Sequence, residues 1–338
     1  MNKKPASSAR RAERQAAGQQ SEVPQSPPQA KNKVPGRTLG FVIMSLLILF
    51  VAAFMVQQSQ QLDSDDTAAR VTANPELAGF RSDLWYLPDG PMLGFVEIPA
   101  GAFIMGSNPT LDRMAYQNER WSNLQRQGEV DLPTYYIARF ETTQAQFNAF
   151  VRDTGLAQAA VDVSVPGDYP VTNVTWPDAL AYARWLETRL RNSPDTPAAL
   201  QQLFTNGARL TLPNEAEWEK AARGTDGRLF PWGPRPRSNL ANFASDGPVP
   251  VGAIECDSCA HGLADMAGNV WELTRSPLQD YPFDPSDDHE VQGGDPLYVM
   301  RGGSWADELN NVRTAVRGAV DPGVRNNTIG FRLVLTGQ

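Results

Sequence analysis

One segment divides this chain before any fold is considered: from Thr38 to Val56 it runs for 19 residues without a charged side chain. At about 1.5 Å of rise per residue, a helix of this length just crosses a hydrocarbon layer of roughly 30 Å. A cleaved signal peptide is the alternative, but it has a short basic region and an apolar core of about 7–15 residues. Here 37 residues precede the run. We therefore predict a single transmembrane anchor at 38–56.

The charges that flank this run predict its orientation. Lys31, Lys33 and Arg37 precede it, and three aspartates lie between positions 63 and 66. By the positive-inside rule, the N-terminus lies in the cytoplasm and the rest of the chain lies outside. We expect a single-pass protein of the inner (cytoplasmic) membrane, with its folded part in the periplasm.

Composition separates the remaining parts. Residues 1–37 carry eight Lys or Arg against two Glu, a net charge of +6, which leaves −14 for the rest of a chain whose overall charge is −8. Almost no apolar residue occurs there, so we predict a disordered cytoplasmic tail at 1–37. A polar tether follows at 57–79, and one domain occupies 80–338. Because the acidic residues and the net negative charge are concentrated in the folded part, the chain is a poor candidate for nucleic-acid binding.

Three helices are predicted from caps and periodicity. The first begins after Thr142 or Thr143 and ends at Asp153. The second is capped by Thr175, has Pro177 in its first turn, and carries an inner stripe of Leu180, Ala183 and Leu190. The third spans 213–223 and ends at Gly224.

Aromatic and β-branched runs predict short strands. They lie at 95–99, 102–106, 134–140, 298–300, 312–316 and 329–335. Most of the chain after Gly224 is predicted as Gly-, Pro- and Asn-containing loops. The fold class is therefore α+β and rich in loops. Long loops need partners for their backbone groups, and metal ions or disulfides commonly stabilise them.

Several motifs from about Phe95 to Val334 occur in a fixed order. They are Ala102-Phe-Ile-Met-Gly-Ser107, Tyr169-Pro-Val-Thr-Asn-Val-Thr-Trp176, Leu212-Pro-Asn-Glu-Ala-Glu-Trp-Glu-Lys-Ala-Ala-Arg223, Phe230-Pro-Trp-Gly233, Gly262-Leu-Ala-Asp-Met-Ala-Gly-Asn-Val-Trp-Glu-Leu-Thr274, Arg301-Gly-Gly-Ser-Trp305 and Arg325-Asn-Asn-Thr-Ile-Gly-Phe-Arg-Leu-Val334. Together they resemble the formylglycine-generating enzyme (sulfatase-modifying factor) family. The resemblance implies a C-type-lectin-like core elaborated by loops and calcium.

The spacing of Asp265 and Glu272 suits one turn that delivers several oxygens to a hard cation. The resemblance implies a structural calcium site at Asp265, Gly268, Val270 and Glu272, two of them acting through the backbone. From spacing alone, ordinary surface or capping carboxylates remain the alternative. A second calcium site of the family type would use Asn242, the Phe243 carbonyl and Asp246.

The resemblance also locates a catalytic corner, and here the sequence departs from the family. The oxidases carry two copper-binding cysteines two and seven residues after the aromatic of the Gly-Gly-Ser-aromatic step. Counting from Trp305 reaches Asp307 and Val312. A carboxylate and a valine cannot replace soft thiolates as copper(I) ligands. Copper is therefore not expected, and active formylglycine generation is the least favoured function.

Four residues remain candidates for lining a cleft at this corner. Ser304 and Trp271 match positions near the family's active cleft, with structural packing as an equal alternative. Asp307 and Glu308 are the nearby carboxylates. Iron enzymes of the wider superfamily use a histidine cluster, which the two histidines of this chain cannot supply.

Cys256 and Cys259 are the only cysteines of the chain. Outside the cytoplasm such a pair is often oxidised, so we predict a disulfide that staples one loop. A redox role would need a thioredoxin-like strand and helix, which the pattern lacks. A zinc or copper site that adds His261 and His289 is the remaining alternative.

Two functions follow from different classes. The first is a membrane-anchored, non-oxidase accessory or maturation factor that uses the scaffold to bind a periplasmic protein partner. The second is a divergent metal-dependent, oxidoreductase-like enzyme that acts on a peptide or small metabolite through Asp307, Glu308 or Ser304. Fold alone does not decide whether the chain is an enzyme, because function depends on the site.

Overall fold

The computed structural model describes residues 77–122, 124, 127–156, 164–288 and 296–337. The predicted tail at 1–37, the anchor at 38–56, most of the tether and His289 lie outside these ranges. Within them, no helix combines the length and the apolar character needed to cross a membrane.

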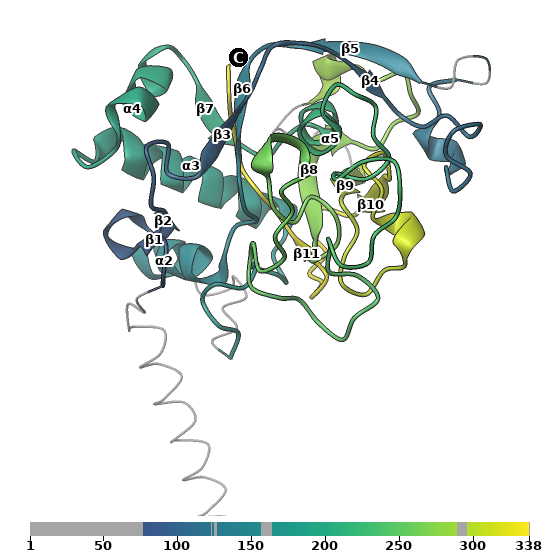
Figure 1. Cartoon of the computed structure of the whole chain (residues 1–338). Helices are drawn as coiled ribbons and strands as arrows, with labels where there is room; N and C mark the ends of the chain where they lie inside the picture. Colours follow the sequence, from purple (N-terminus) through teal and green to yellow (C-terminus); the bar gives the residue numbers. More distant parts are fainter. Residues whose placement is uncertain (1–76, 123, 125–126, 157–163, 289–295, 338) are drawn as a thin grey trace, which may run out of the picture. The chain divides into compact units, whose positions relative to one another are not determined.

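A four-stranded antiparallel sheet joins the two ends of the described domain (Figure 1). The C-terminal strand β12 lies inside this sheet, between β6 and β7. Ile137 therefore has a partner on each side, Val96 on β3 and Val334 on β12. In sheet order the strands are β3 (Phe95–Ile98), β6 (Tyr135–Ala138), β12 (Val334–Thr336) and β7 (Arg209–Thr211).

A second four-stranded sheet carries the motifs of the last quarter of the chain. Its central pair, β8 and β9, is antiparallel and places Glu272 opposite Arg301, whereas β11 runs parallel to β8. In sheet order the strands are β10 (Gly318–Val320), β9 (Tyr298–Arg301), β8 (Trp271–Pro277) and β11 (Ile329–Gly330). Two short hairpins complete the strands: β1 (Phe80–Arg81) with β2 (Leu87–Pro88), and β4 (Gly101–Met105) with β5 (Gly128–Leu132).

The strand predicted at 312–316 is wrong, because these residues form turns and the strand begins at Gly318. The buried Arg313 explains the error. Its guanidinium donates to Glu119 at 2.7 and 2.8 Å and also pairs with Asp112. Val312 and Val316 are thus buried in a loop that surrounds an ion pair, and their β-branched side chains do not mark a strand. The predicted strand at 329–335 is interrupted, since only β11 and β12 pair.

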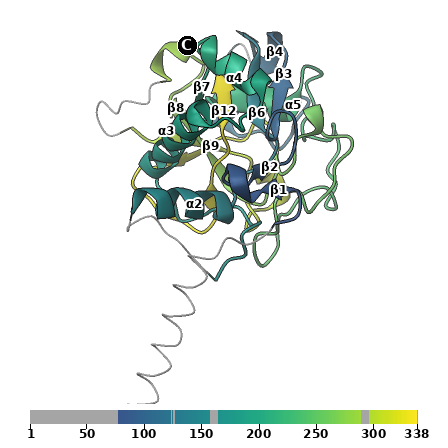
Figure 2. The same ribbon diagram turned by 90° about the vertical axis from the view of Figure 1, so that its left-hand side faces the viewer.

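The three predicted helices are present, and a fourth was not predicted. Thr143 and Thr175 each accept a hydrogen bond from the third helical amide, so both helices begin with a capping box. In Figures 1 and 2, helices α2, α3 and α4 lie on one side of the sheets, and α5 (Glu215–Arg223) lies against their centre. The helices are α2 (Gln144–Thr154), α3 (Trp176–Asn192), α4 (Ala198–Thr205) and α5 (Glu215–Arg223).

Ion pairs accompany the apolar core in the interior. Every residue of α5 is buried, including its charged ones. Arg301 of β9 donates to Glu215 and to Glu219 at 3.0 Å each. Burying a charge is costly unless it is paired and hydrogen-bonded, so these contacts are what permit α5 to lie inside. The main apolar core is a separate cluster between α2, α3 and the sheets, where Phe147 packs against Tyr182 and Phe331.

Candidate functional site

The corner where the family resemblance places a catalytic pair is built around the carboxylate of Asp307. Its Oδ2 atom accepts hydrogen bonds from the indole nitrogen of Trp271 at 2.8 Å and from the Oγ and N atoms of Ser304 at 2.6 and 3.0 Å. Its Oδ1 atom accepts from Nδ2 of Asn311 at 2.7 Å. Both oxygens of Asp307 therefore hold the turn closed against β8.

Val312 occupies the position at which the family's oxidases carry their second copper-binding cysteine, and its side chain is closely packed. Val312 is fully buried in a small cluster with Phe230 and Trp232, whose rings stack at 5.2 Å. Gly303 lies against this segment with φ +74°, and a Cβ there would be 2.6 Å from the carbonyl oxygen of Asn311. Only glycine permits this approach, because an added side chain would meet backbone. The corner is thus a closed structural turn.

Of the four predicted cleft residues, the structure brings three together. Ser304, Asp307 and Trp271 form one hydrogen-bonded group. Glu308 does not join them: its side chain is exposed, and it precedes a single 3-10 turn, Leu309–Asn311, without capping it. Of the two readings for Ser304 and Trp271, structural packing is the one that these contacts support.

A second group, which we call the acidic cluster, consists of Glu141, Asp265 and Glu272. Glu272 is buried and receives two bonds of 2.6 Å from Arg332 and one of 2.7 Å from the Trp218 indole. Glu141, at the start of the loop before α2, accepts from the side chain of Asn269 at 2.6 Å.

Electrostatics sets the acidic cluster apart from the Asp307 corner. Burial raises the pKa of Glu141 well above its usual range, and the charges of Asp265 and Glu272 add to the effect. Burial also raises the pKa of Asp265 to about 6, although a hydrogen bond from the Gly252 amide and the charge of Arg332 oppose the shift. Three carboxylates thus share one arginine, and the remaining negative charge favours a bound proton or a bound cation.

The turn from Asp265 to Glu272 fits a calcium ion only in part. Asp265 Oδ2 accepts from Gly252 N at 2.6 Å, and its Oδ1 atom has no hydrogen bond to another described residue. Gly268 has φ +74°, and a Cβ there would be 2.1 Å from the Asn242 carbonyl oxygen, so the turn requires glycine. Glu272, however, is paired with Arg332 through both oxygens. In the described part of the chain, no three His, Cys, Asp or Glu side chains form a group suited to a metal ion.

The residues of the second predicted calcium site have other partners. The Asn242 side chain accepts from Ser245 Oγ at 2.7 Å and donates to the Gly247 carbonyl at 3.0 Å, while Asp246 is exposed. The Asn242 carbonyl accepts from the Asn269 amide. This loop stabilises the Asp265–Glu272 turn through backbone contacts, and calcium at either site stays a prediction.

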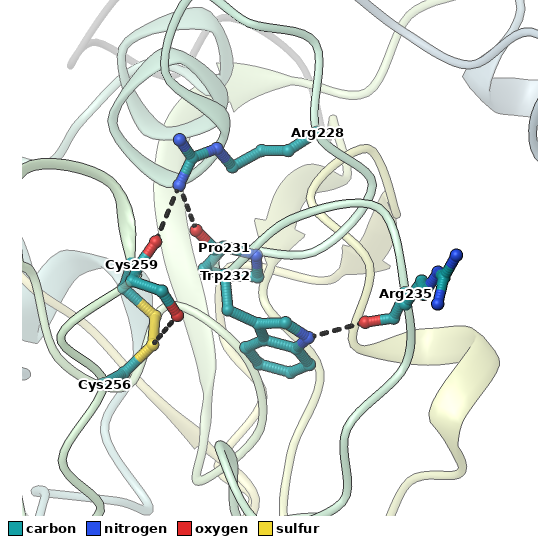
Figure 3. Close-up of a disulfide and its surroundings, with 7 residues drawn as sticks. Arg228, Pro231, Trp232, Arg235, Cys256 and Cys259 are labelled. Carbon is teal, nitrogen blue, oxygen red and sulfur yellow. Dashed lines mark hydrogen bonds between the residues drawn. A yellow bond between two sulfur atoms is a disulfide. The ribbon is translucent and has the colours of Figure 1, made fainter.

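Cys256 and Cys259 form a disulfide with sulfurs 2.02 Å apart, as expected from the sequence (Figure 3). Beside it, Arg228 Nη1 donates to the carbonyls of Pro231 and Ser258 at 2.8 and 2.9 Å. The arginine thus ties the Phe230–Gly233 loop to the disulfide loop (Figure 3). Because the sulfurs are bonded to each other, they leave no thiolate for the alternative metal site.

Sequence reasoning missed Glu141 and Arg332 as members of a site. Arg332 belongs to the quoted Gly-Phe-Arg step but was given no role, and Glu141 follows a predicted strand without any motif of its own. A signal was available, since an arginine between apolar residues of a predicted strand requires a buried acidic partner.

Comparison with known proteins identifies the scaffold. Residues 88–336 match the sulfatase-modifying factor enzyme 1-like domain. "Hercynine oxygenase" of Mycolicibacterium smegmatis is 31% identical over 284 residues, covering 70% of this chain and 60% of that protein. "Inactive C-alpha-formylglycine-generating enzyme 2" of Mus musculus is 30% identical over 184 residues, or 49% of this chain and 48% of that protein. The chain therefore spans about 60% or less of the length of these relatives.

The fold is shared with a solved structure. That of PvdO from Pseudomonas aeruginosa superimposes with a TM-score of 0.58 at 23% identity, covering 71% of this chain and 93% of that chain. At this identity the likeness concerns the mixed α and β architecture alone.

Proposed function

Because the chain belongs to the sulfatase-modifying factor enzyme 1-like domain family, we propose that it uses this scaffold as a non-oxidase accessory or maturation factor that binds a protein partner. The single observation that carries the proposal is the state of the former catalytic corner. Asp307 is held by four hydrogen bonds and Val312 is fully buried. Neither can bind copper(I) as a thiolate pair would.

The corner is also unsuited to acid–base chemistry by Asp307. A general base needs a free lone pair within reach of a substrate proton. Here both carboxylate oxygens accept from protein donors, three of which come from Trp271 and Ser304. One relative of this chain carries the word "inactive" in its name. A non-oxidase function for this chain would therefore have a parallel among proteins with this domain.

Three further elements belong to the proposal and rest on the sequence. We infer an anchor at 38–56, which places the domain in the periplasm with the N-terminus in the cytoplasm. We also infer a C-type-lectin-like core, and a structural calcium ion with Asp265 as its side-chain ligand. The net negative charge of the acidic cluster supports the cation, and the pairing of Glu272 with Arg332 opposes it.

A divergent metal-dependent enzyme acting on a peptide or small metabolite is the second candidate. The observation in its favour is the 31% identity to the hercynine oxygenase of Mycolicibacterium smegmatis, over 70% of this chain. Its residues would have to lie outside the Asp307 corner, and the acidic cluster is the place where a cation would be bound.

The test uses the full-length chain purified in mild detergent. It is incubated with copper, a thiol reductant, oxygen and a cysteine-containing sulfatase-type peptide, and the peptide mass is followed. We expect no conversion of the cysteine, and elemental analysis should find calcium as the only stoichiometric metal. Conversion of the peptide, or a stoichiometric redox metal, would contradict the accessory function. In parallel, crosslinking in cells should recover the same partner in independent replicates.

A further inference from the structure

A pocket of about 740 Å³ opens between two surface segments that belong to neither site described above. One segment runs from Pro109 to Ser122 and the other is Asp280–Tyr281. Its volume falls within the range of about 300–1,000 Å³ that is typical of ligand sites. None of its lining residues belongs to the Asp307 corner or the acidic cluster.

The floor of this pocket is fixed in place. Tyr281 is buried, and its hydroxyl accepts a hydrogen bond from Arg301 Nη2 at 3.1 Å. The Arg317 guanidinium lies 4.1 Å from the centre of its ring, and the Trp121 ring packs at 5.2 Å. A surface whose side chains are already positioned loses less entropy when a ligand binds.

Three polar side chains in the walls have no partner among the described residues. Among the described residues, the side chains of Gln117, Arg120 and Asp280 form no hydrogen bond or ion pair with any other residue. One is a cation, one an anion and one an amide that can donate and accept. The pocket therefore offers two opposite charges and an amide to a ligand.

Exposed leucines occur within two residues of Pro109 and of Asp280, which line the pocket. Leu111 is 72% exposed, Leu278 is 36% exposed and Leu297 is 45% exposed. Leu278, two residues before Asp280, donates its backbone N–H to Leu297 O at 2.7 Å, so the backbones of these two leucines are adjacent. Tyr116, on the first segment, is also exposed. Exposed apolar side chains near such polar groups are typical of a surface that another protein covers.

We propose that this pocket binds an extended segment of the partner protein. The segment would place an acidic residue against Arg120 and a basic residue against Asp280, with the Gln117 amide on its backbone and its apolar residues on the leucines. A sugar or small metabolite would fill the polar pocket but leave the leucines uncovered. This inference rests on the proposed accessory function and names where the partner binds.

The experiment selects peptides on the full-length chain. A phage-displayed library of random twelve-residue peptides is panned on the immobilised protein, and enriched peptides are synthesised and titrated by fluorescence anisotropy. We expect enriched peptides to carry one acidic and one basic residue between apolar ones. Arg120→Glu and Asp280→Lys should each weaken their binding by about tenfold, because each turns an attraction into a repulsion.

Matched variants make the result specific. Arg237→Glu changes an exposed arginine outside the pocket and should leave the affinity unchanged. The double variant Arg120→Glu with Asp280→Lys should recover affinity for peptides whose two charges are exchanged. Thermal unfolding verifies that each variant is folded, which is expected because both side chains are exposed.

The outcomes separate the two proposals. A library that yields no binder, or peptides that bind wild type and both pocket variants equally, would overturn the pocket and leave the accessory function standing. Conversion of the cysteine peptide in the copper assay would overturn the accessory function without any change in the peptide titration.

Discussion

Trp271 and Glu272 are neighbours on β8, yet their side chains bond to two very different carboxylate sites. The Trp271 indole donates to Asp307, and Glu272 accepts from Arg332. Successive side chains of a strand point to opposite faces of a sheet, so one strand serves both sites. At the first, four donors satisfy one carboxylate. At the second, Glu141, Asp265 and Glu272 share one arginine.

The difference lies in what each site still requires. Donors from the protein itself complete the Asp307 corner, so it has no need of a ligand. The acidic cluster has an excess of negative charge in a buried place, which a proton or a cation must reduce. The Asp307 corner is therefore a structural turn, whereas the acidic cluster, at which we predict a calcium ion, keeps an excess of negative charge.

Removing Arg332, which pairs with Glu272 of the acidic cluster, should have the largest effect. We expect Arg332→Met to lower the free energy of unfolding by about 3–5 kcal/mol, because it leaves Glu272 as an unpaired buried charge. Urea unfolding measures the loss. Arg325→Met is the control, since Arg325 forms a partly exposed pair with Asp178 and its removal should cost about 1 kcal/mol or less. Equal losses in the two variants would contradict the view that Arg332 compensates a buried charge of the acidic cluster.

The pKa of Asp265 predicts a pH dependence. Its value is about 6 in the folded protein against 3.8 ordinarily, so the folded state binds the proton more tightly. The stabilisation is fully present below pH 3.8 and is lost as the pH rises through about 6, for a total of about 2–3 kcal/mol. The measurement is urea unfolding from pH 4 to 7 in the presence of a chelator.

Asp265→Asn isolates this contribution, because asparagine can still accept the bond from Gly252 and tolerates the φ of +56°. The variant should be more stable than wild type at pH 7 and equal to it near pH 4. If calcium binds here, added calcium should stabilise wild type at pH 7 and leave the variant unaffected. A pH profile that is identical in both proteins would show that Asp265 is not the titrating group.

The Asp307 corner should respond less strongly. We expect Asp307→Ala to destabilise the domain by about 2 kcal/mol, because it leaves the Trp271 indole and the Ser304 hydroxyl without an acceptor. Urea unfolding measures the loss. If this variant retained full stability but lost a measured catalytic activity, the result would favour a catalytic role of Asp307 over a structural one.

Glu308 should give the smallest effect. Its side chain is exposed, so Glu308→Gln should change the free energy of unfolding by less than about 0.5 kcal/mol. Peptide binding should stay unchanged as well. A clear loss of either property would mean that the exposed acid belongs to a working site at this corner.

Most helices could be predicted from their capping residues, whereas strand β8 could not be predicted because it carries residues of buried ion pairs. Two helices begin at Thr143 and Thr175, and one ends at Gly224. Each of these caps bonds to residues only a few positions away, so the sequence alone indicates where these helices begin and end. Strand β8 was not predicted, because its buried Glu272 and Arg275 break the apolar pattern that marks an interior strand. Their partners, Arg332 and Glu217, are more than 50 residues away.

The same limit applies to the sites. The motifs located the Asp307 corner and grouped Ser304 with Trp271, but only the fold shows that Asp307 uses both oxygens. Glu141 joins the acidic cluster from 124 residues before Asp265, a separation at which spacing carries no information. The pocket at Arg120 and Asp280 was missed for this reason too.

The place of β12 has a consequence for synthesis of the chain. Val334 and Leu335 pair with β6 on one side and β7 on the other, so the sheet cannot close before residues 334 and 335 have been synthesised. Until then, β6 and β7 each expose an unpaired edge. A premature stop a few residues upstream would leave a product that chaperones and proteases recognise as unfinished.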